Sequence, residues 1–133
     1  MNSESNQTST SESDPRFPSG PWAGIYRQWG MQSRQRLDLY FATGAITGGG
    51  RDPAGPFIVR GSYDLETGRV TLAKSYDSHR VEYAGASDGD GIEGRWTIQY
   101  MMSLTDRGEF HIWPDAEAVG AQQALRAEEP VGA

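Results

Sequence analysis

The sequence predicts an all-β fold: about eight antiparallel strands in up-and-down order, closed into a barrel. Three observations predict it. The chain of 133 residues contains 17 glycines and 11% aromatic residues, a combination that favours strands and tight turns over helices. Turn-forming residues recur at short intervals, and the segments between them alternate apolar and polar residues. Thirteen of the fourteen aromatic residues lie between Trp22 and Trp113, which marks that segment as the folded domain.

Turn signals define the predicted strands in order along the chain. The signals are Gly30, Thr43 with Gly44, residues 52–56, Thr67 with Gly68, Asp77 with Ser78, residues 88–91 and residues 106–108. Between them we expect strands near residues 22–29, 34–42, 45–50, 56–64, 69–76, 79–86, 91–100 and 108–113.

Hairpin pairing indicates which side of each strand is buried, because opposed residues in an antiparallel pair point to the same side. If Tyr76 opposes His79, then Lys74 faces Val81. The same construction predicts the pairs Leu72–Tyr83, Val70–Gly85, Tyr63–Val70, Gly61–Leu72, Val59–Lys74, Phe41–Ile46, Leu39–Gly48, Gly85–Ile92, Tyr83–Gly94 and Val81–Trp96. Every hairpin then places its larger apolar residues on one common face, and a one-residue slip would exchange the two faces.

A meander with one apolar face can bury it in a two-sheet sandwich or in a barrel. Closure removes the exposed sheet edges, and about eight strands is a natural number for it. Glycine at inward strand positions supports the barrel, because it permits sharp coiling and leaves room for large rings opposite. These positions are Gly24, Gly48, Gly50, Gly61, Gly85 and Gly94.

The two ends of the chain differ from the barrel domain, which we place at residues 20–114. Residues 1–19 are mostly Ser, Thr, Asn, Gln and Glu, and we expect a disordered tail because such a segment buries too little surface to offset its ordering entropy. They also lack the basic start and apolar centre of a secretion signal, so we expect a cytoplasmic location. Residues 115–133 are expected to form a short helix, over about 115–127, or a loose tail.

Composition argues against several classes of function. The net charge is −6 without a basic block, so we expect neither a nucleic acid nor a membrane as partner. No apolar run approaches the roughly 18 residues that span a bilayer. The absence of cysteine excludes disulfides and thiolate metal sites. With two histidines placed apart, we expect no metal and no cofactor.

Several motifs resemble those of calycin barrels, the group that includes lipocalins, fatty-acid-binding proteins and avidins. Gly20-Pro21-Trp22 resembles the Gly-x-Trp start of these barrels, and residues 61–64 and 94–98 are similar to avidins in particular. The run from residue 55 to 64, followed by residues 94–98, also resembles an uncharacterised barrel domain rich in glycine and aromatic residues. The resemblance covers about residues 20–113 and implies the barrel architecture. The polar residues with which avidins contact biotin have no match here, and the paired cysteines of lipocalins are absent.

One end of the predicted barrel is the candidate ligand site. Alternate turns of a meander lie at opposite ends, so one end gathers the turns near residues 30–33, 51–56, 77–78 and 101–107. Inward residues near this end combine polar atoms with apolar walls, as barrel-mouth ligand sites do. The candidates are Tyr26, Gln28, Phe57, Lys74, Tyr76, His79 and Tyr100.

Lys74 and His79 each have two interpretations. Lys74 lies on the apolar side of its strand, and it is either an amine in a partly dry pocket with a lowered pKa or a rim lysine whose ammonium reaches water. His79 either contacts a ligand or acts as a base, or it is satisfied by a neighbouring hydroxyl. The pattern favours the structural interpretation for both residues.

The sequence therefore supports three hypotheses for function. The first is a small barrel that binds a small, partly apolar ligand at its mouth. The alternative is a protein-interaction or scaffold module with a filled core and no ligand, with Trp29, Tyr40 and Trp113 as exposed candidates and a protein partner or homo-oligomer expected. The third, an enzyme that uses Lys74 or His79, is disfavoured because it rests on residue type alone.

Overall fold

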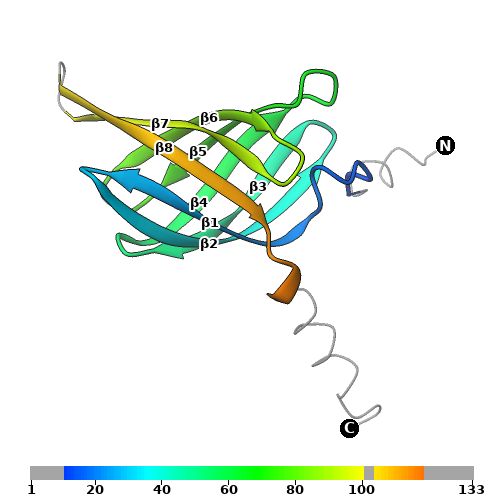
Figure 1. Ribbon diagram of the computed structural model, residues 1–133, viewed down its shortest axis with the longest axis horizontal. Helices are drawn as coiled ribbons and strands as arrows, with labels where there is room; N and C mark the ends of the chain where they lie inside the picture. Colours follow the sequence, from blue (N-terminus) through cyan, green and yellow to red (C-terminus); the bar gives the residue numbers. More distant parts are fainter. Residues whose placement is uncertain (1–10, 101–103, 119–133) are drawn as a thin grey trace, which may run out of the picture.

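The computed structural model describes residues 11–100 and 104–118 and shows an eight-stranded closed barrel (Figure 1). Each strand pairs antiparallel with the next along the chain, and β8 pairs with β1 to close the cylinder. The predicted fold class is confirmed. The strands are β1 (Gly20–Gln28), β2 (Met31–Ala42), β3 (Ala45–Asp52), β4 (Gly55–Tyr63), β5 (Arg69–Ser75), β6 (Arg80–Ser87), β7 (Ile92–Tyr100) and β8 (Leu104–Pro114).

Two hairpins close with two-residue turns in which both central residues have positive φ. Trp29 and Gly30 have φ of 54° and 75°, and Thr43 and Gly44 have φ of 48° and 83°. Turns of this kind match the right-handed twist of the strands they join. Glycine adopts the conformation without strain, whereas Trp29 and Thr43 hold it at a cost.

The barrel interior is filled by the apolar face that hairpin pairing predicts. The buried residues include Trp22, Leu37, Leu39, Phe41, Ile46, Val59, Leu72, Tyr83, Trp96, Phe110 and Ile112. Inward glycines bring neighbouring strands close together. A Cβ added at Gly61 would lie 2.0 Å from the carbonyl oxygen of Thr71, and one added at Gly94 would lie 2.1 Å from that of Ala84. These positions therefore exclude any side chain.

The observed register agrees with the predicted pairs at three hairpins, and it differs at the fourth. Lys74 opposes Val81 as predicted, and the pairs predicted between β2 and β3 and between β4 and β5 are observed as well. Between β6 and β7, however, Gly85 opposes Gly94 instead of Ile92. The strand β6 continues to Ser87, and the Asp88 N–H bonds the carbonyl of Gly91 to close a tighter turn than predicted. A two-residue shift keeps every side chain on its face.

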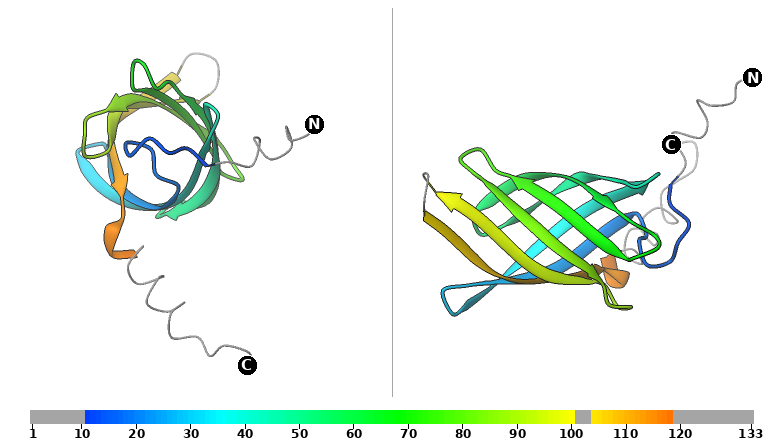
Figure 2. Two further views of the ribbon diagram at one scale, coloured as in Figure 1. Left: turned by 90° about the vertical axis from the view of Figure 1, so that its right-hand side faces the viewer. Right: turned by 90° about the horizontal axis from the view of Figure 1, so that it is seen from above.

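Residues 11–19 form a plug across one end of the barrel (Figure 2, left). Phe17 is fully buried there, with its ring centroid 5.6 Å from that of Phe41 and 5.1 Å from that of Tyr63. The sequence assigns Phe17 to a disordered tail, because the polar composition of residues 1–19 outweighs a single apolar side chain. The structure places it in the core.

Hydrogen bonds fasten the plug to the strands around it. The indole Nε1 of Trp22 donates to the carbonyl of Pro18 at 2.8 Å, and the hydroxyl of Ser19 accepts from the N–H of Phe41 at 2.9 Å. The hydroxyl of Tyr63 donates to Glu12 Oε1 at 2.6 Å. This end of the barrel is therefore closed by both apolar packing and polar contacts.

The C-terminal segment leaves the barrel at the plugged end (Figure 1). Residues 116–118 form a single helical turn. The rest of the helix expected over about 115–127 lies outside the described residues. Within residues 11–100 and 104–118, no helix is long and apolar enough to cross a membrane.

Candidate functional site

The end opposite the plug, which we call the mouth, opens into a cavity of about 230 Å³. Its volume equals that of about eight water molecules at roughly 30 Å³ each. The turns that follow β1, β3 and β5 lie at the mouth. The cavity is lined by Tyr26, Gln28, Trp29, Ala54, Lys74, Tyr76, His79, Val81, Tyr83, Trp96 and Ile98.

Lys74 lies at the inner part of this cavity, and only 1% of its side chain is exposed. Alternation along β5 directs it inward together with Leu72. Its ammonium group donates to three acceptors: Gln35 Oε1 at 3.0 Å, Asp52 Oδ2 at 2.9 Å and the Tyr83 hydroxyl at 3.1 Å. All three protons of the ammonium are therefore used within the protein.

Four aromatic rings surround the same ammonium group. Its nitrogen lies 4.4 Å from the ring centroid of Phe57, 5.0 Å from those of Tyr26 and Tyr83, and 5.5 Å from that of Tyr76. A cation within about 6 Å of a ring centroid is attracted by the ring quadrupole. The rings therefore form an aromatic box that the protein fills with its own cation.

Asp52 and Gln35 complete a closed polar network with the lysine, which we call the Lys74 cluster (Lys74, Asp52, Gln35, Tyr76 and Tyr83). The side chain of Asp52 is fully buried. Its Oδ1 accepts from the N–H of Ala54 at 2.8 Å, and its Oδ2 accepts from the Tyr76 hydroxyl as well as from Lys74. The amide of Gln35 donates to the carbonyl of Ile25 at 3.3 Å and to the Tyr83 hydroxyl at 3.1 Å.

Burial shifts the pKa values of this cluster. Burial lowers the pKa of Lys74 to about 8, and the neighbouring Asp52 carboxylate acts in the opposite direction. Burial also raises the pKa of Tyr76 and of Tyr83 far above the ordinary value for tyrosine, and Asp52 adds to both shifts. Both hydroxyls are therefore protonated at neutral pH and serve as hydrogen-bonding groups.

The interpretation of Lys74 as a rim lysine with its ammonium in water is wrong. A buried acceptor set holds the ammonium beneath the cavity, because Asp52 and Gln35 both point inward at the same level of the barrel. The alternative, an amine in a dry environment with a lowered pKa, agrees with its 1% exposure and with the direction of its pKa shift.

The structure brings most of the predicted site residues together. Tyr26, Gln28, Lys74, Tyr76 and His79 all line the cavity. The His79 imidazole stacks on the Tyr76 ring with centroids 4.5 Å apart, and the amide nitrogen of Gln28 donates to Asp106 Oδ2 at 3.0 Å.

Two other predicted residues are not part of the cavity lining. Phe57 is buried beneath the cavity, with its ring against the Lys74 ammonium. Tyr100 belongs to the end of β7, and its side chain lies outside the described part of the structure.

Two polar residues of the cluster are missing from the sequence-based candidates, although a signal for them exists. Gln35 lies two residues before Leu37 on β2, so it shares the inward side. Asp52 lies two residues after the inward Gly50 on β3. A polar residue at an inward position needs a buried hydrogen-bonding partner. Lys74, the inward cation, could have been identified as the partner of Gln35 and of Asp52.

No protein-family model, no curated protein and no solved structure matches this chain. Within the described ranges, no group of three or more His, Cys, Asp or Glu side chains could hold a metal ion.

Lys74 is the only lysine in the chain, so amine labelling reports on its burial directly. We expect acetic anhydride at pH 8 to modify the α-amino group of the folded protein readily. The rate of modification of Lys74 should be at least about a hundredfold lower, because its amine is buried and hydrogen-bonded. In 6 M guanidinium chloride both amines should react. Peptide mass spectrometry measures the two sites, and rapid labelling of Lys74 in the folded protein would contradict the burial.

Proposed function

We propose that the barrel binds a small, partly apolar ligand in the cavity at its mouth. The observation that carries this proposal is the difference between the two ends of the barrel. Phe17 is fully buried in the plug at one end, whereas the other end keeps a cavity of about 230 Å³. A lumen that is packed at one end and hollow at the other is the arrangement expected of a single-entrance binding site.

The character of the cavity wall supports the proposal. Tyr26, Val81, Trp96 and Ile98 supply apolar and aromatic surface, and His79 supplies a polar group. Ligand sites typically combine a mainly apolar lining with a few polar groups that fix orientation. The volume is below the roughly 300–1,000 Å³ of sites for drug-sized molecules, so the ligand is small. The resemblance of the chain to calycin barrels supports the same function.

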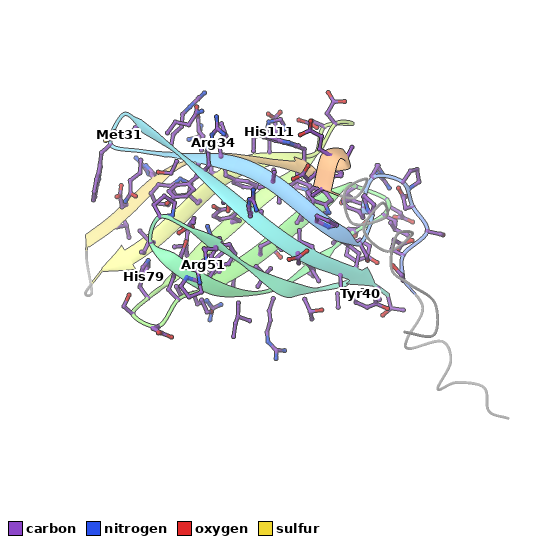
Figure 3. The ribbon with its side chains drawn as sticks, turned by 90° about the horizontal axis from the view of Figure 1, so that it is seen from below. Met31, Arg34, Tyr40, Arg51, His79 and His111 are labelled. Carbon is purple, nitrogen blue, oxygen red and sulfur yellow. The ribbon has the colours of Figure 1, made fainter. Side chains whose placement is uncertain are left out.

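The alternative function, a protein-interaction module, would use exposed apolar residues. Trp29 is 78% exposed and Met31 is 71% exposed at the tip of the β1–β2 hairpin. Met31 lies at the mouth end of the barrel, and Tyr40 lies toward the plugged end (Figure 3). Because Tyr40 lies away from the hairpin tip that carries Trp29 and Met31, these exposed side chains support this alternative less than the cavity supports a ligand.

Filling the cavity tests the proposed function. Val81 lines the cavity, whereas Ile58 is 62% exposed on the outer wall of β4. With benzyl alcohol as the probe, we expect saturable amide shifts at the cavity residues in NMR spectra of the wild-type protein. Val81→Trp should weaken this binding by about tenfold or more because the new ring occupies the cavity, an effect of about 1.4 kcal/mol.

The matched control adds the same ring outside the barrel. Ile58→Trp should leave the affinity for benzyl alcohol unchanged. The proposal is wrong if the wild-type protein shows no saturable shifts at the cavity, or if Val81→Trp binds the probe as tightly as the wild-type protein does.

A further inference from the structure

We infer that the ligand of the mouth cavity is an uncharged ring compound with one polar substituent. This inference rests on the proposed function and specifies the chemistry of its ligand. It follows from which groups of the cavity are already used within the protein and which remain for a ligand.

The one strongly basic side chain in the described lining is not free to bind an anion. Lys74 is the only lysine or arginine among the described residues that line the cavity. Its three protons already bond Gln35, Asp52 and Tyr83, and its nitrogen lies within 5.5 Å of four ring centroids. An anionic ligand would have to break one of these bonds to gain a contact with the ammonium.

No carboxylate is among the described residues that line the cavity either. Both oxygens of Asp52 are used, one by the N–H of Ala54 and the other by Lys74 and Tyr76. The side chain of Asp52 is fully buried and does not line the cavity. The Lys74 ammonium and the Asp52 carboxylate lie 2.9 Å apart, so their charges balance within the cluster.

The electrostatic consequence is that a charged ligand meets no free Lys, Arg, Asp or Glu side chain among the described residues of the cavity wall. Such a ligand would lose its hydration on entry, and the free-energy cost of burying an unpaired charge is large. A neutral ligand loses much less hydration free energy on entry. The Lys74 cluster therefore acts as a neutral polar floor beneath the cavity.

The shape of the lining favours a flat ligand. Trp96 donates its indole N–H to the carbonyl of Arg27 at 3.0 Å, so toward the cavity it offers ring surface only. Together with the Tyr26 and Tyr76 rings it provides aromatic surface on which another ring can pack in an offset or edge-to-face arrangement.

Two polar groups at the mouth remain for the substituent of the ligand. Nδ1 of His79 is hydrogen-bonded to the hydroxyl of Ser78 at 2.8 Å, which leaves Nε2 for a ligand. The amide nitrogen of Gln28 is bonded to Asp106, which leaves its carbonyl oxygen. A single hydroxyl, carbonyl or amide group on the ligand would match this inventory.

Three probes of nearly equal size test the inference at pH 7: benzyl alcohol, benzoate and benzylammonium. NMR titration of the wild-type protein should show that benzyl alcohol binds at least about tenfold tighter than either ion, because the ions lose hydration without a counter-charge. The inference is overturned if benzoate or benzylammonium binds as tightly as benzyl alcohol.

Asp52→Asn tests the charge balance of the floor with little change of shape. It leaves the Lys74 ammonium without its counter-ion and removes the carboxylate that raises the pKa of Lys74, so both proteins are compared at pH 6, where the amine holds its proton more strongly. The affinity for benzoate should then rise by about tenfold relative to the wild-type protein. Glu82→Gln is the control, because it neutralises a carboxylate that is 53% exposed on the outer wall, and it should leave the affinity for all three probes unchanged. An Asp52→Asn protein that folds but binds benzoate no better contradicts the inference. If it does not fold, the wild-type comparison decides.

The outcomes separate this inference from the proposed function. If all three probes bind equally and Val81→Trp abolishes the binding, the cavity is a ligand site but its ligand class is wrong. If none of the probes gives saturable shifts at the cavity, both the ligand class and the proposed function are wrong.

Discussion

Lys74→Met is expected to lower the free energy of unfolding by about 3–5 kcal/mol, the usual cost of removing one partner of a buried ion pair. Methionine fills nearly the same space as lysine, so the loss of packing is small. The cost arises from the groups that remain. Asp52 would keep a buried charge without its cation, and Gln35 and Tyr83 would each lose a hydrogen-bonding partner.

The surroundings of Lys74 explain why this loss is larger than for an ordinary lysine. Only 1% of its side chain is exposed, and Asp52 is fully buried, so water cannot replace the missing ammonium without opening the cluster. The four rings around the ammonium would also lose their attraction to a cation. The pair thus differs from a surface ion pair, for which the typical contribution is about 0–1 kcal/mol.

Urea denaturation of four proteins measures the effect: the wild-type protein, Lys74→Met, Asp52→Asn and the double variant. The double variant should lose less stability than the two single changes added together, because no unpaired charge remains in it. Arg80→Met is the control, since Arg80 pairs with Glu82 at 2.7 Å on the surface and is 63% exposed, and it should change stability by about 0.5 kcal/mol or less. A loss below about 1 kcal/mol for Lys74→Met would contradict the buried pair.

Much of the barrel could be predicted from sequence because a strand has a side-chain period of two. Short turns fix which residues oppose each other, so pairing Tyr76 with His79 was enough to place Lys74 opposite Val81 on the inner face. The same logic is insensitive to shifts of two residues. The β6–β7 hairpin shows this, since Gly85 opposes Gly94 instead of Ile92 while both remain on the inner face.

The Lys74 cluster was only partly predictable for a different reason. Alternation shows that Lys74 points inward, but it does not show how far from the mouth the ammonium lies or what receives its protons. That depends on Asp52, at the end of β3, and on Gln35, near the start of β2. Those residues are 22 and 39 positions from Lys74 in the chain, and only the closed barrel brings them into contact.

The plug was not predictable from average composition. Residues 1–19 are polar as a group, and composition cannot show that Phe17 alone reaches the lumen. The partner surface for that ring forms only when Phe41 and Tyr63, from two different strands, meet at one end of the barrel. A tertiary contact of this kind leaves no local pattern in the sequence.

Phe17→Ala is therefore expected to lower the free energy of unfolding by about 3–5 kcal/mol, as is typical for a fully buried phenylalanine. Phe17 is 0% exposed, and its ring packs against Phe41 and Tyr63. The change would leave a void at the closed end and expose rings that now face one another. Phe17→Leu should cost less, because leucine keeps much of the buried apolar volume.

The comparison that decides whether residues 11–19 belong to the folded domain is between Phe17→Ala and Ile58→Ala in urea denaturation. Ile58 is 62% exposed on the outer wall, so its loss should change stability by about 0.5 kcal/mol or less. If the plug contacted the barrel without contributing to its stability, the two variants would have similar free energies of unfolding. A cost several times larger for Phe17→Ala would show that the strands and the plug unfold together. The mouth would then be the only end of the described barrel through which a ligand enters the folded protein.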